Sequence, residues 1–384
     1  MADSKFTKPE DIAAHFGEDY SLHYGAMSPP IFQTSIFADD VGGPYGYSRV
    51  TNPTDEVFEK KVAAMEHALA ENGGRALVTS SGISAIVTAV MSVVGAGDHM
   101  IMVRTAYSSG RGMVKWLERF GVSVTFVRGV ELSEFEAALR PNTKLIYLES
   151  PSSGIFQLQD LRAVAELAHA HGIITAIDNT YCSPVYQQPL DMGIDLVIHS
   201  ATKYLGGHSD VVAGVVVGCG DAIRNAASTR LTLGCIAPPM QAWLLQRGIR
   251  TLPVRMKAHF ESGMAVARYL ESHPMVERVY YPALESHPQH DLYLRQMSGC
   301  GGLLSFKPRG SYESRADMMS RFRVFTRAQS WGGYESLVYP LGALSAPGEE
   351  VNAAYDGGVI RLAVGLEHID TLLEDLEQAL SALK

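Results

Sequence analysis

Two charged residues that follow short apolar segments have the types and spacing that cofactor chemistry needs. Lys203 comes just after the segment DLVIHS, and Asp178 closes the preceding apolar segment, IITAID. A desolvated lysine amine that loses its proton can form a Schiff base with an aldehyde. A carboxylate close to such a lysine can keep a pyridine nitrogen protonated, as pyridoxal 5'-phosphate (PLP) requires. The pair therefore predicts a PLP site.

Segments rich in hydroxyl groups and glycine contain residues that could bind the other parts of this cofactor. The segment SSGISA opens an expected helix at Gly82, and free N–H groups at a helix N-terminus bind phosphate well. Tyr107 follows another apolar segment, and its ring could stack on the pyridine. The candidate cofactor-binding residues from this reasoning are Ser81, Gly82, Ile83, Tyr107, Asp178, Ser200, Thr202 and Lys203.

Simpler interpretations exist for the same residues. Lys203 could be a solvated residue beyond the end of a strand, and Asp178 or Ser81 could be a cap. Ser200 and Lys203 also fit the SxxK pattern of serine-nucleophile enzymes, although the SDN- and KTG-type partner motifs are missing. Neither GxGxxG nor GxxxxGK[ST] occurs, so dinucleotide and P-loop sites are poorly supported.

Charge and composition exclude several other classes of protein. The net charge is −9, and the 32 lysines and arginines form no runs, which argues against nucleic acid and anionic membranes as partners. No apolar segment has the length of a membrane span, and the N-terminus lacks the core of a signal peptide. The four cysteines form no CxxC, and the histidines of HAH (169–171) do not share a helix face. We expect a cytoplasmic protein without a metal site.

Strands and helices alternate from about residue 60 to 220, and they must position the candidate residues. The expected strands are RALVTS, HMIMVRT, VSVTFV, KLIYLES, IITAIDNT and DLVIHS. Such alternation predicts βαβ units and a mostly parallel sheet, whose ligands bind beyond the carboxyl ends of the strands. GRGMVKWLERF is expected to be an amphipathic helix with Met113, Val114, Leu117 and Phe120 on one face. The long helix PVRMKAHFESGMAVARYLESHP is expected to lead into a second unit.

Seven motifs together carry a resemblance to a known family. SATKYLGGHSD, YSRVTNPT, TAYSS, LESP, IDNT, SWGGYESL and GVIRLAVGLE closely resemble the cysteine/methionine-metabolism family of PLP enzymes, which includes cystathionine β-lyase, cystathionine γ-lyase, cystathionine γ-synthase and methionine γ-lyase. The resemblance implies the α/β fold of type I PLP-dependent transferases, with a mostly parallel sheet covered by helices. It also implies an N-terminal arm (1–58), a large PLP-binding domain (59–250) and a smaller C-terminal α/β domain (251–384).

The same resemblance implies roles for individual residues. Lys203 would be the Schiff-base lysine, with Asp178 as partner of the pyridinium, and Lys203 and Tyr107 would be the catalytic residues. Tyr47 and Arg49 match residues that bind the cofactor phosphate of a neighbouring subunit, which implies a homotetramer built from dimers with shared active sites. The implied substrate-binding residues are Tyr107, Ser330, Trp331 and Arg361. Because these residues are all present, an inactive structural member is disfavoured.

The substrate is an amino acid, but its identity depends on a few positions around the expected pocket. Trp331 resembles the cystathionine β-lyases, and Ser153 stands where γ-active members commonly carry Asn. Both favour β-elimination on L-cystathionine or a cysteine S-conjugate, giving pyruvate, ammonia and a thiol. Gln329 and the segment 337–358 match neither branch well. The alternative is γ-elimination or γ-replacement on methionine, cystathionine, a homoserine derivative or a related non-sulfur amino acid.

Overall fold

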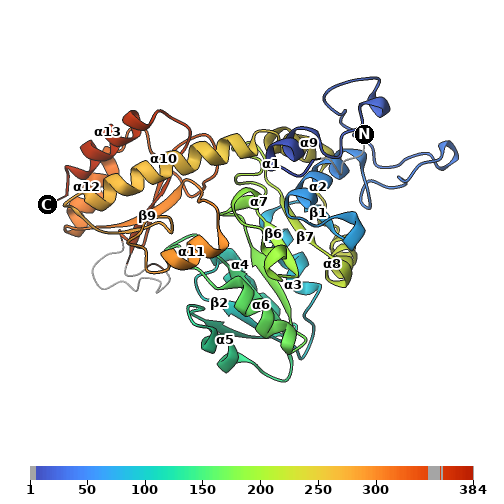
Figure 1. Cartoon of the computed structure of the whole chain (residues 1–384), viewed down its shortest axis with the longest axis horizontal. Helices are drawn as coiled ribbons and strands as arrows, with labels where there is room; N and C mark the ends of the chain where they lie inside the picture. The colour runs from blue at the N-terminus through green and yellow to red at the C-terminus, as the bar shows by residue number, and fades with distance from the viewer. Residues whose placement is uncertain (1–5, 345–354, 356–357, 384) are drawn as a thin grey trace.

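The chain forms two sheets that are connected through a long helix. A computed structural model describes residues 6–344, 355 and 358–383; much of the divergent segment 337–358 (345–354 and 356–357) therefore lies outside the described residues. Helix α10 (Leu252–Ser272), drawn in yellow in Figure 1, runs from the larger sheet towards the C-terminal elements. This confirms the long helix expected at the start of the second unit.

The larger sheet is mixed but mostly parallel, as expected. Strands β2 to β6 run parallel to one another, whereas β7 is antiparallel to both of its neighbours, β1 and β6. The inner strands are buried on both faces, which explains their continuous apolar sequences. In spatial order, its strands in the described part of the chain are β1 (Arg75–Thr79), β7 (Gly214–Gly218), β6 (Leu196–His199), β5 (Ile174–Asp178), β4 (Thr143–Glu149), β2 (His99–Val103) and β3 (Ser123–Val127).

Helices pack against this sheet, and one of them differs from the expectation. Helix α4 ends at Glu118, so Phe120 lies beyond it and is 50% exposed, with its ring against Trp116. The prediction that Phe120 lies on the apolar face of this helix was therefore wrong, because the helix ends two residues before it. The helices of this part are α1 (Pro9–His15), α2 (Pro53–Met65), α3 (Gly82–Met91), α4 (Ser108–Glu118), α5 (Leu132–Ala138), α6 (Leu161–Ala170), α7 (Ser183–Tyr186), α8 (Gly220–Leu233) and α9 (Pro239–Ile249).

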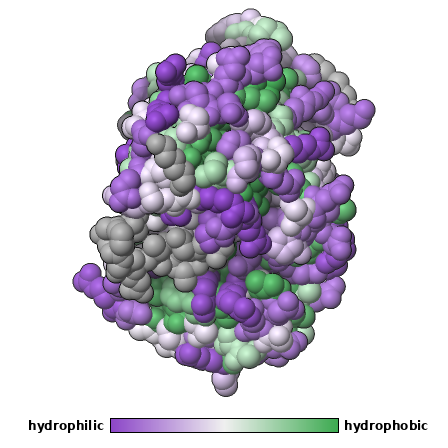
Figure 2. Space-filling model, turned by 90° about the vertical axis from the view of Figure 1, so that its left-hand side faces the viewer, coloured by the Kyte–Doolittle hydropathy of each residue, from purple (hydrophilic) through white to green (hydrophobic). Residues whose placement is uncertain are grey.

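The second sheet is smaller and mostly antiparallel. Its order is β10 (Thr326–Arg327), β11 (Leu337–Leu341), β12 (Val359–Ala363), β9 (Leu303–Pro308) and β8 (Val276–Tyr280). Helices α11 (His290–Gln296), α12 (Tyr312–Arg321) and α13 (Ile369–Leu380) complete this part. Figure 2 shows mostly hydrophilic side chains over this end of the molecule, with only scattered hydrophobic ones. No helix among the described residues is long and apolar enough to cross a membrane.

The N-terminal segment is fixed to its own chain before it reaches α2. The buried carboxylate of Glu18 forms ion pairs with Lys61 at 3.0 Å and with Arg250 at 2.9 Å. Asn52 caps α2 by accepting a hydrogen bond from the N–H of Thr54. Helix α2 thus continues across residue 58, where the arm was expected to end, and the division into an arm and two domains stays a prediction. Short 3₁₀ helices lie at Tyr20–His23, Asp39–Val41, Ala70–Asn72 and Pro189–Met192.

Candidate functional site

A cavity of about 730 Å³ lies at the carboxyl ends of the parallel strands. Strand β4 ends at Glu149 and β5 at Asp178, and the two residues are direct neighbours in the sheet. Ser200 follows β6 at the same edge. Among the residues that line the cavity are eleven of those expected at the site: Ser81, Gly82, Ile83, Tyr107, Asp178, Ser200, Thr202, Lys203, Ser330, Trp331 and Arg361.

The amine of Lys203 is mostly shielded from solvent inside this cavity. Its Nζ donates a hydrogen bond to the hydroxyl of Ser330 at 2.8 Å and lies 5.6 Å from the centre of the Trp331 ring. Burial, together with the positive charge of Arg361, lowers the pKa of Lys203 to about 8, although Asp178 acts in the opposite direction. The amine is therefore much closer to its neutral, nucleophilic form at neutral pH than an ordinary lysine.

Asp178 presents one carboxylate oxygen to the cavity. Its Oδ1 accepts hydrogen bonds from the N–H of Thr180, at 3.0 Å, and from the Thr180 hydroxyl. No donor of the described residues bonds to Oδ2, so this atom remains for a ring nitrogen. Burial raises the pKa of Asp178, against the effect of the Thr180 hydrogen bonds. Burial and Asp178 also raise the pKa of Glu149 to about 8. Two adjacent buried carboxyl groups favour a cation beside them, such as a protonated pyridine.

The start of helix α3 fits a phosphate group. The Ser81 hydroxyl accepts from the N–H of Ser84 at 3.1 Å, whereas the N–H groups of Gly82 and Ile83 have no acceptor among the described residues. A Cβ at Gly82 would lie 2.6 Å from the hydroxyl oxygen of Ser200, so only glycine lets α3 and the loop after β6 come this close. The resulting cradle of backbone N–H groups and hydroxyls is suited to an anion.

Arg361 comes from the other sheet and completes the cavity. It lies on β12, and its guanidinium donates to the carbonyl of Ser153 at 3.2 Å and to the carbonyl of Gln329 at 3.1 Å. No carboxylate of the described residues forms an ion pair with it, although it is 8% exposed. Its other N–H groups can therefore bind the carboxylate of a ligand, and two parallel hydrogen bonds suit that geometry.

Glu149 is a functional candidate that the sequence reasoning missed. One of its oxygens accepts the N–H of Tyr107 at 2.6 Å, and the other accepts the N–H of Ser153 at 2.9 Å. Glu149 thereby fixes the backbone of Tyr107, which is expected to stack on the cofactor. It also fixes the backbone of Ser153, whose carbonyl accepts a hydrogen bond from Arg361. Its position at the end of a parallel strand, in the motif LESP, was the signal that could have identified it.

Tyr47 and Arg49 are the two expected cofactor residues that this chain does not bring to its own cavity. Tyr47 is 46% exposed, and the Arg49 guanidinium lies 5.4 Å from the centre of its ring. The Arg49 guanidinium also approaches the carbonyl of Leu231 at the end of α8, at 3.5 Å. Their role in a neighbouring subunit stays a prediction.

Comparisons with known proteins agree with this geometry. The model of the family described as Cys/Met metabolism PLP-dependent enzyme matches residues 10–381. The chain belongs to this family. It is 40% identical to the L-methionine gamma-lyase of Treponema denticola over 94% of each chain. It is 41% identical to the O-succinylhomoserine sulfhydrylase of Pseudomonas aeruginosa, over 90% of this chain and 86% of that protein. It is 39% identical to the cystathionine gamma-lyase of Bacillus subtilis, over 97% and 99%.

Family membership establishes the cofactor and the fold. The cofactor of this enzyme is PLP, and the two sheets are those of the type I fold. The strand ends and the start of α3 supply groups that fit its pyridine nitrogen, aldehyde and phosphate. The SxxK alternative has no support, because the Lys203 amine hydrogen-bonds to Ser330 and the family is a PLP family.

Attachment of PLP to the cofactor-free enzyme should depend on the protonation of Lys203. Since the amine must be neutral to attack the aldehyde, the rate of attachment should rise with pH and level off above about pH 8. Stopped-flow measurement of the visible absorption over a pH series tests this. Arg361→Met, which removes a neighbouring positive charge, should move the profile to higher pH. A rate that still rises tenfold per unit through about pH 10, as for an ordinary lysine, would contradict the assignment.

Glu149→Gln should disturb both residues that this carboxylate holds. The amide nitrogen of glutamine is a donor, so one of the two backbone N–H contacts must be lost. We expect a higher KM and a fall in kcat/KM of about tenfold to a hundredfold, the scale of a small misplacement of reacting groups. The visible circular dichroism of bound PLP should change as well. The control is Glu136→Gln, at an exposed position on α5. An unchanged KM and an unchanged spectrum would show that Glu149 has no positioning role.

Proposed function

We propose that this enzyme catalyses γ-elimination on an amino acid with a small uncharged thioether, of which L-methionine is the type. The supporting observation is the charge of the cavity. Among the described lining residues the charged ones are Glu149, Asp178, Lys203 and Arg361, and Arg361 is needed for the α-carboxylate. The segment 345–357 contains no Lys, Arg or His in its sequence. L-Cystathionine carries a second carboxylate at its far end, and such a group would have no cation to bind there.

The names of the relatives also favour γ-elimination. Proteins named methionine gamma-lyase and cystathionine gamma-lyase match this chain over nearly its whole length. In the sequence, Trp331 and Ser153 favoured β-elimination, but the contacts of these two residues do not support that reaction. Trp331 packs edge-on against Tyr204 at 5.4 Å, and Ser153 uses its backbone to bind Glu149 and Arg361. We therefore prefer the γ alternative to β-elimination on cystathionine.

The residues of the cavity account for the steps of this reaction. Arg361 would bind the substrate α-carboxylate, and Tyr107 would cover the reacting face. The neutral amine of Lys203 would take the proton from Cα, and its flexible stem would let it serve at Cβ as well. Bound PLP supplies the electron sink for the charge left on carbon, and Asp178 would hold the proton on its ring nitrogen. With one water consumed, methionine would give 2-oxobutyrate, ammonia and methanethiol.

Identification of the 2-oxo acid product tests this proposal most directly. We expect 2-oxobutyrate from L-methionine, with kcat/KM for L-cystathionine lower by about tenfold or more, since an uncompensated carboxylate costs at least this factor. The measurement is chromatography of derivatised 2-oxo acids over a panel of methionine, cystathionine, cysteine S-conjugates and O-succinylhomoserine with sulfide. Pyruvate from cystathionine as the main product would restore β-elimination. Homocysteine and succinate, formed from O-succinylhomoserine and sulfide, would indicate γ-replacement.

We also propose that the enzyme is a homo-oligomer whose sites are shared between subunits. Tyr47 and Arg49 are exposed and lie outside their own Lys203 cavity, while the cradle at Gly82 lacks a cationic side chain among its described lining residues. Arg49 of a second copy would supply a guanidinium to the cofactor phosphate there.

Mixed oligomers test this arrangement. Arg49→Ala chains and Lys203→Ala chains should each be nearly inactive alone. After subunit exchange, half of the dimers would be hybrids with one intact site, so activity should recover to about a quarter of the wild-type value. Exchange is verified with two affinity tags. Demonstrated exchange without any recovery would place Arg49 at the site of its own chain.

A further inference from the structure

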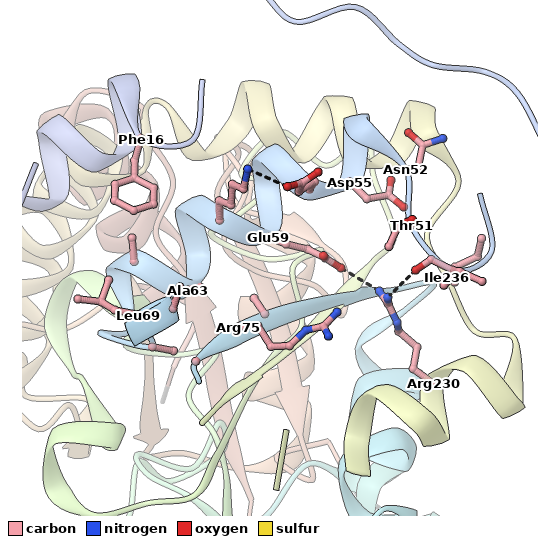
Figure 3. A pocket seen from close by; sticks show the side chains of 18 of the residues that line it. Phe16, Thr51, Asn52, Asp55, Glu59, Ala63, Leu69, Arg75, Arg230 and Ile236 are labelled. Atoms are coloured by element: carbon pink, nitrogen blue, oxygen red, sulfur yellow. Dashed lines mark hydrogen bonds and ion pairs between the residues drawn. The ribbon is translucent and has the colours of Figure 1, made fainter. Parts of the chain in front are cut away.

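Three arginines in the described part of the chain are buried, and they differ in the partners of their guanidinium groups. They are Arg230, Arg255 and Arg361. Figure 3 shows Arg230 beside a second cavity, of about 630 Å³, with its ion pair to Glu59 at 2.8 Å. Arg361 lines the Lys203 cavity, where the substrate α-carboxylate would bind. Arg255 on α10 lines neither cavity, and no carboxylate of the described residues pairs with it.

Arg255 binds backbone carbonyls instead, and one of them belongs to the residue after Lys203. Its Nη1 donates to the carbonyl of Tyr204 and its Nη2 to the carbonyl of Gly248, in the last turn of α9, both at 2.8 Å. A Cβ at Gly207, whose φ is +71°, would overlap the guanidinium, so the turn that follows Lys203 rests directly on it. Since a buried cation is costly unless it is hydrogen-bonded, these contacts are what keeps Arg255 in the interior.

His259, one turn further along α10, contacts the same turn and also the strand that carries Arg361. Its ring centre lies 5.1 Å from that of Tyr204. Burial lowers the pKa of His259 to about 4, so the ring is neutral at physiological pH. Its Nδ1 donates to the carbonyl of Val364 at 2.9 Å, and its Nε2 has no partner among the described residues. Val364 directly follows β12, the strand of Arg361.

Helix α10 therefore contacts both sides of the Lys203 cavity. Arg255 and His259 lie on one face of the helix because they are four residues apart. Through this face α10 binds the backbone next to Lys203 and the end of β12. The separation of the Lys203 amine and the Arg361 guanidinium depends on how these two segments are held.

We propose that Arg255 and His259 are positioning residues for the reaction, and that they fix the place of Lys203 relative to Arg361. A substrate bound through its α-carboxylate to Arg361 would then present its Cα to the amine of Lys203. Neither Arg255 nor His259 is among the described residues that line the cavity, so each acts through other residues. These roles rest on the proposed function of Lys203 and Arg361, but not on which amino acid is the substrate.

Two variants of His259 test the contact with Val364 without a change of charge. The amide nitrogen of asparagine can donate to this carbonyl in place of Nδ1, whereas leucine cannot. In His259→Leu the amine of Lys203 should move away from the charge of Arg361, so the midpoint of the pH profile for PLP attachment to the cofactor-free enzyme should rise by about half a unit or more. His259→Asn should restore the wild-type midpoint. A wild-type midpoint in His259→Leu would overturn the role of His259.

Kinetics of the holoenzyme give a second readout, with whichever amino acid of the panel reacts fastest. In His259→Leu the guanidinium of Arg361 still binds the α-carboxylate, so KM should change by less than about threefold. The value of kcat should fall by about tenfold to a hundredfold, because the amine is misplaced from Cα. A higher KM at unchanged kcat would contradict the proposal.

Arg255→Lys and Leu270→Ala separate positioning from a general loss of stability. Arg255→Lys keeps the charge, but one ammonium group cannot replace the fork that serves two carbonyls. It should change the attachment profile and kcat in the same direction as His259→Leu. Leu270 is fully buried on α10, about 22 Å along the helix from Arg255. Leu270→Ala should lower the melting temperature and leave the profile and the visible circular dichroism of bound PLP unchanged. Wild-type values in both His259→Leu and Arg255→Lys, or the same changes in Leu270→Ala, would overturn the proposal.

Discussion

The pKa of the Lys203 amine depends on three features of the cavity: its burial, the charge of Arg361 and the charge of Asp178. Burial and the charge of Arg361 favour its neutral form, and the carboxylate of Asp178 favours its ammonium form. The outcome is a pKa of about 8, which suits the role proposed for this amine in binding the cofactor and moving a proton. Neither partner is adjacent in the sequence: Asp178 belongs to β5 of the large sheet, whereas Arg361 belongs to β12 of the small one. The relative position of the two sheets therefore sets the chemistry of this lysine.

The carboxylate of Glu149 helps to hold that relative position locally. It binds the backbone of Tyr107 on one side and that of Ser153 on the other, and the Ser153 carbonyl in turn binds Arg361. A buried acid is costly, and here both of its oxygens are satisfied by backbone donors. Asp55 on α2 is buried as well, but its Oδ1 has no donor. That contrast distinguishes an acid whose two oxygens have donors from one with an unsatisfied oxygen.

The motifs and the pattern of elements predicted most of the large sheet and most of the cavity. Parallel strands require continuous apolar segments, and their carboxyl ends meet at one edge, so Asp178, Ser200 and Lys203 could be assigned together. Local sequence pattern is a poorer guide where it competes with helix termination or with tertiary contacts. Phe120 follows the helical period of α4, but the helix ends before it. Glu149 was overlooked because nothing in its local sequence shows that two distant backbone segments use it as an acceptor.

The sequence by itself determined that the cofactor is PLP. A lysine for the aldehyde, an acid for the pyridine nitrogen and a helix N-terminus for the phosphate each follow a predicted strand, and this pattern can be read from the sequence. It did not determine the substrate, and the proposed preference for an uncharged thioether rests on the few charged residues that line the cavity. Only the tertiary structure brings Arg361 to Ser153 and Gln329 and places Arg255 against the carbonyl of Tyr204. Such contacts join residues far apart in the chain, and their geometry arises from the packing of whole elements rather than from any local pattern.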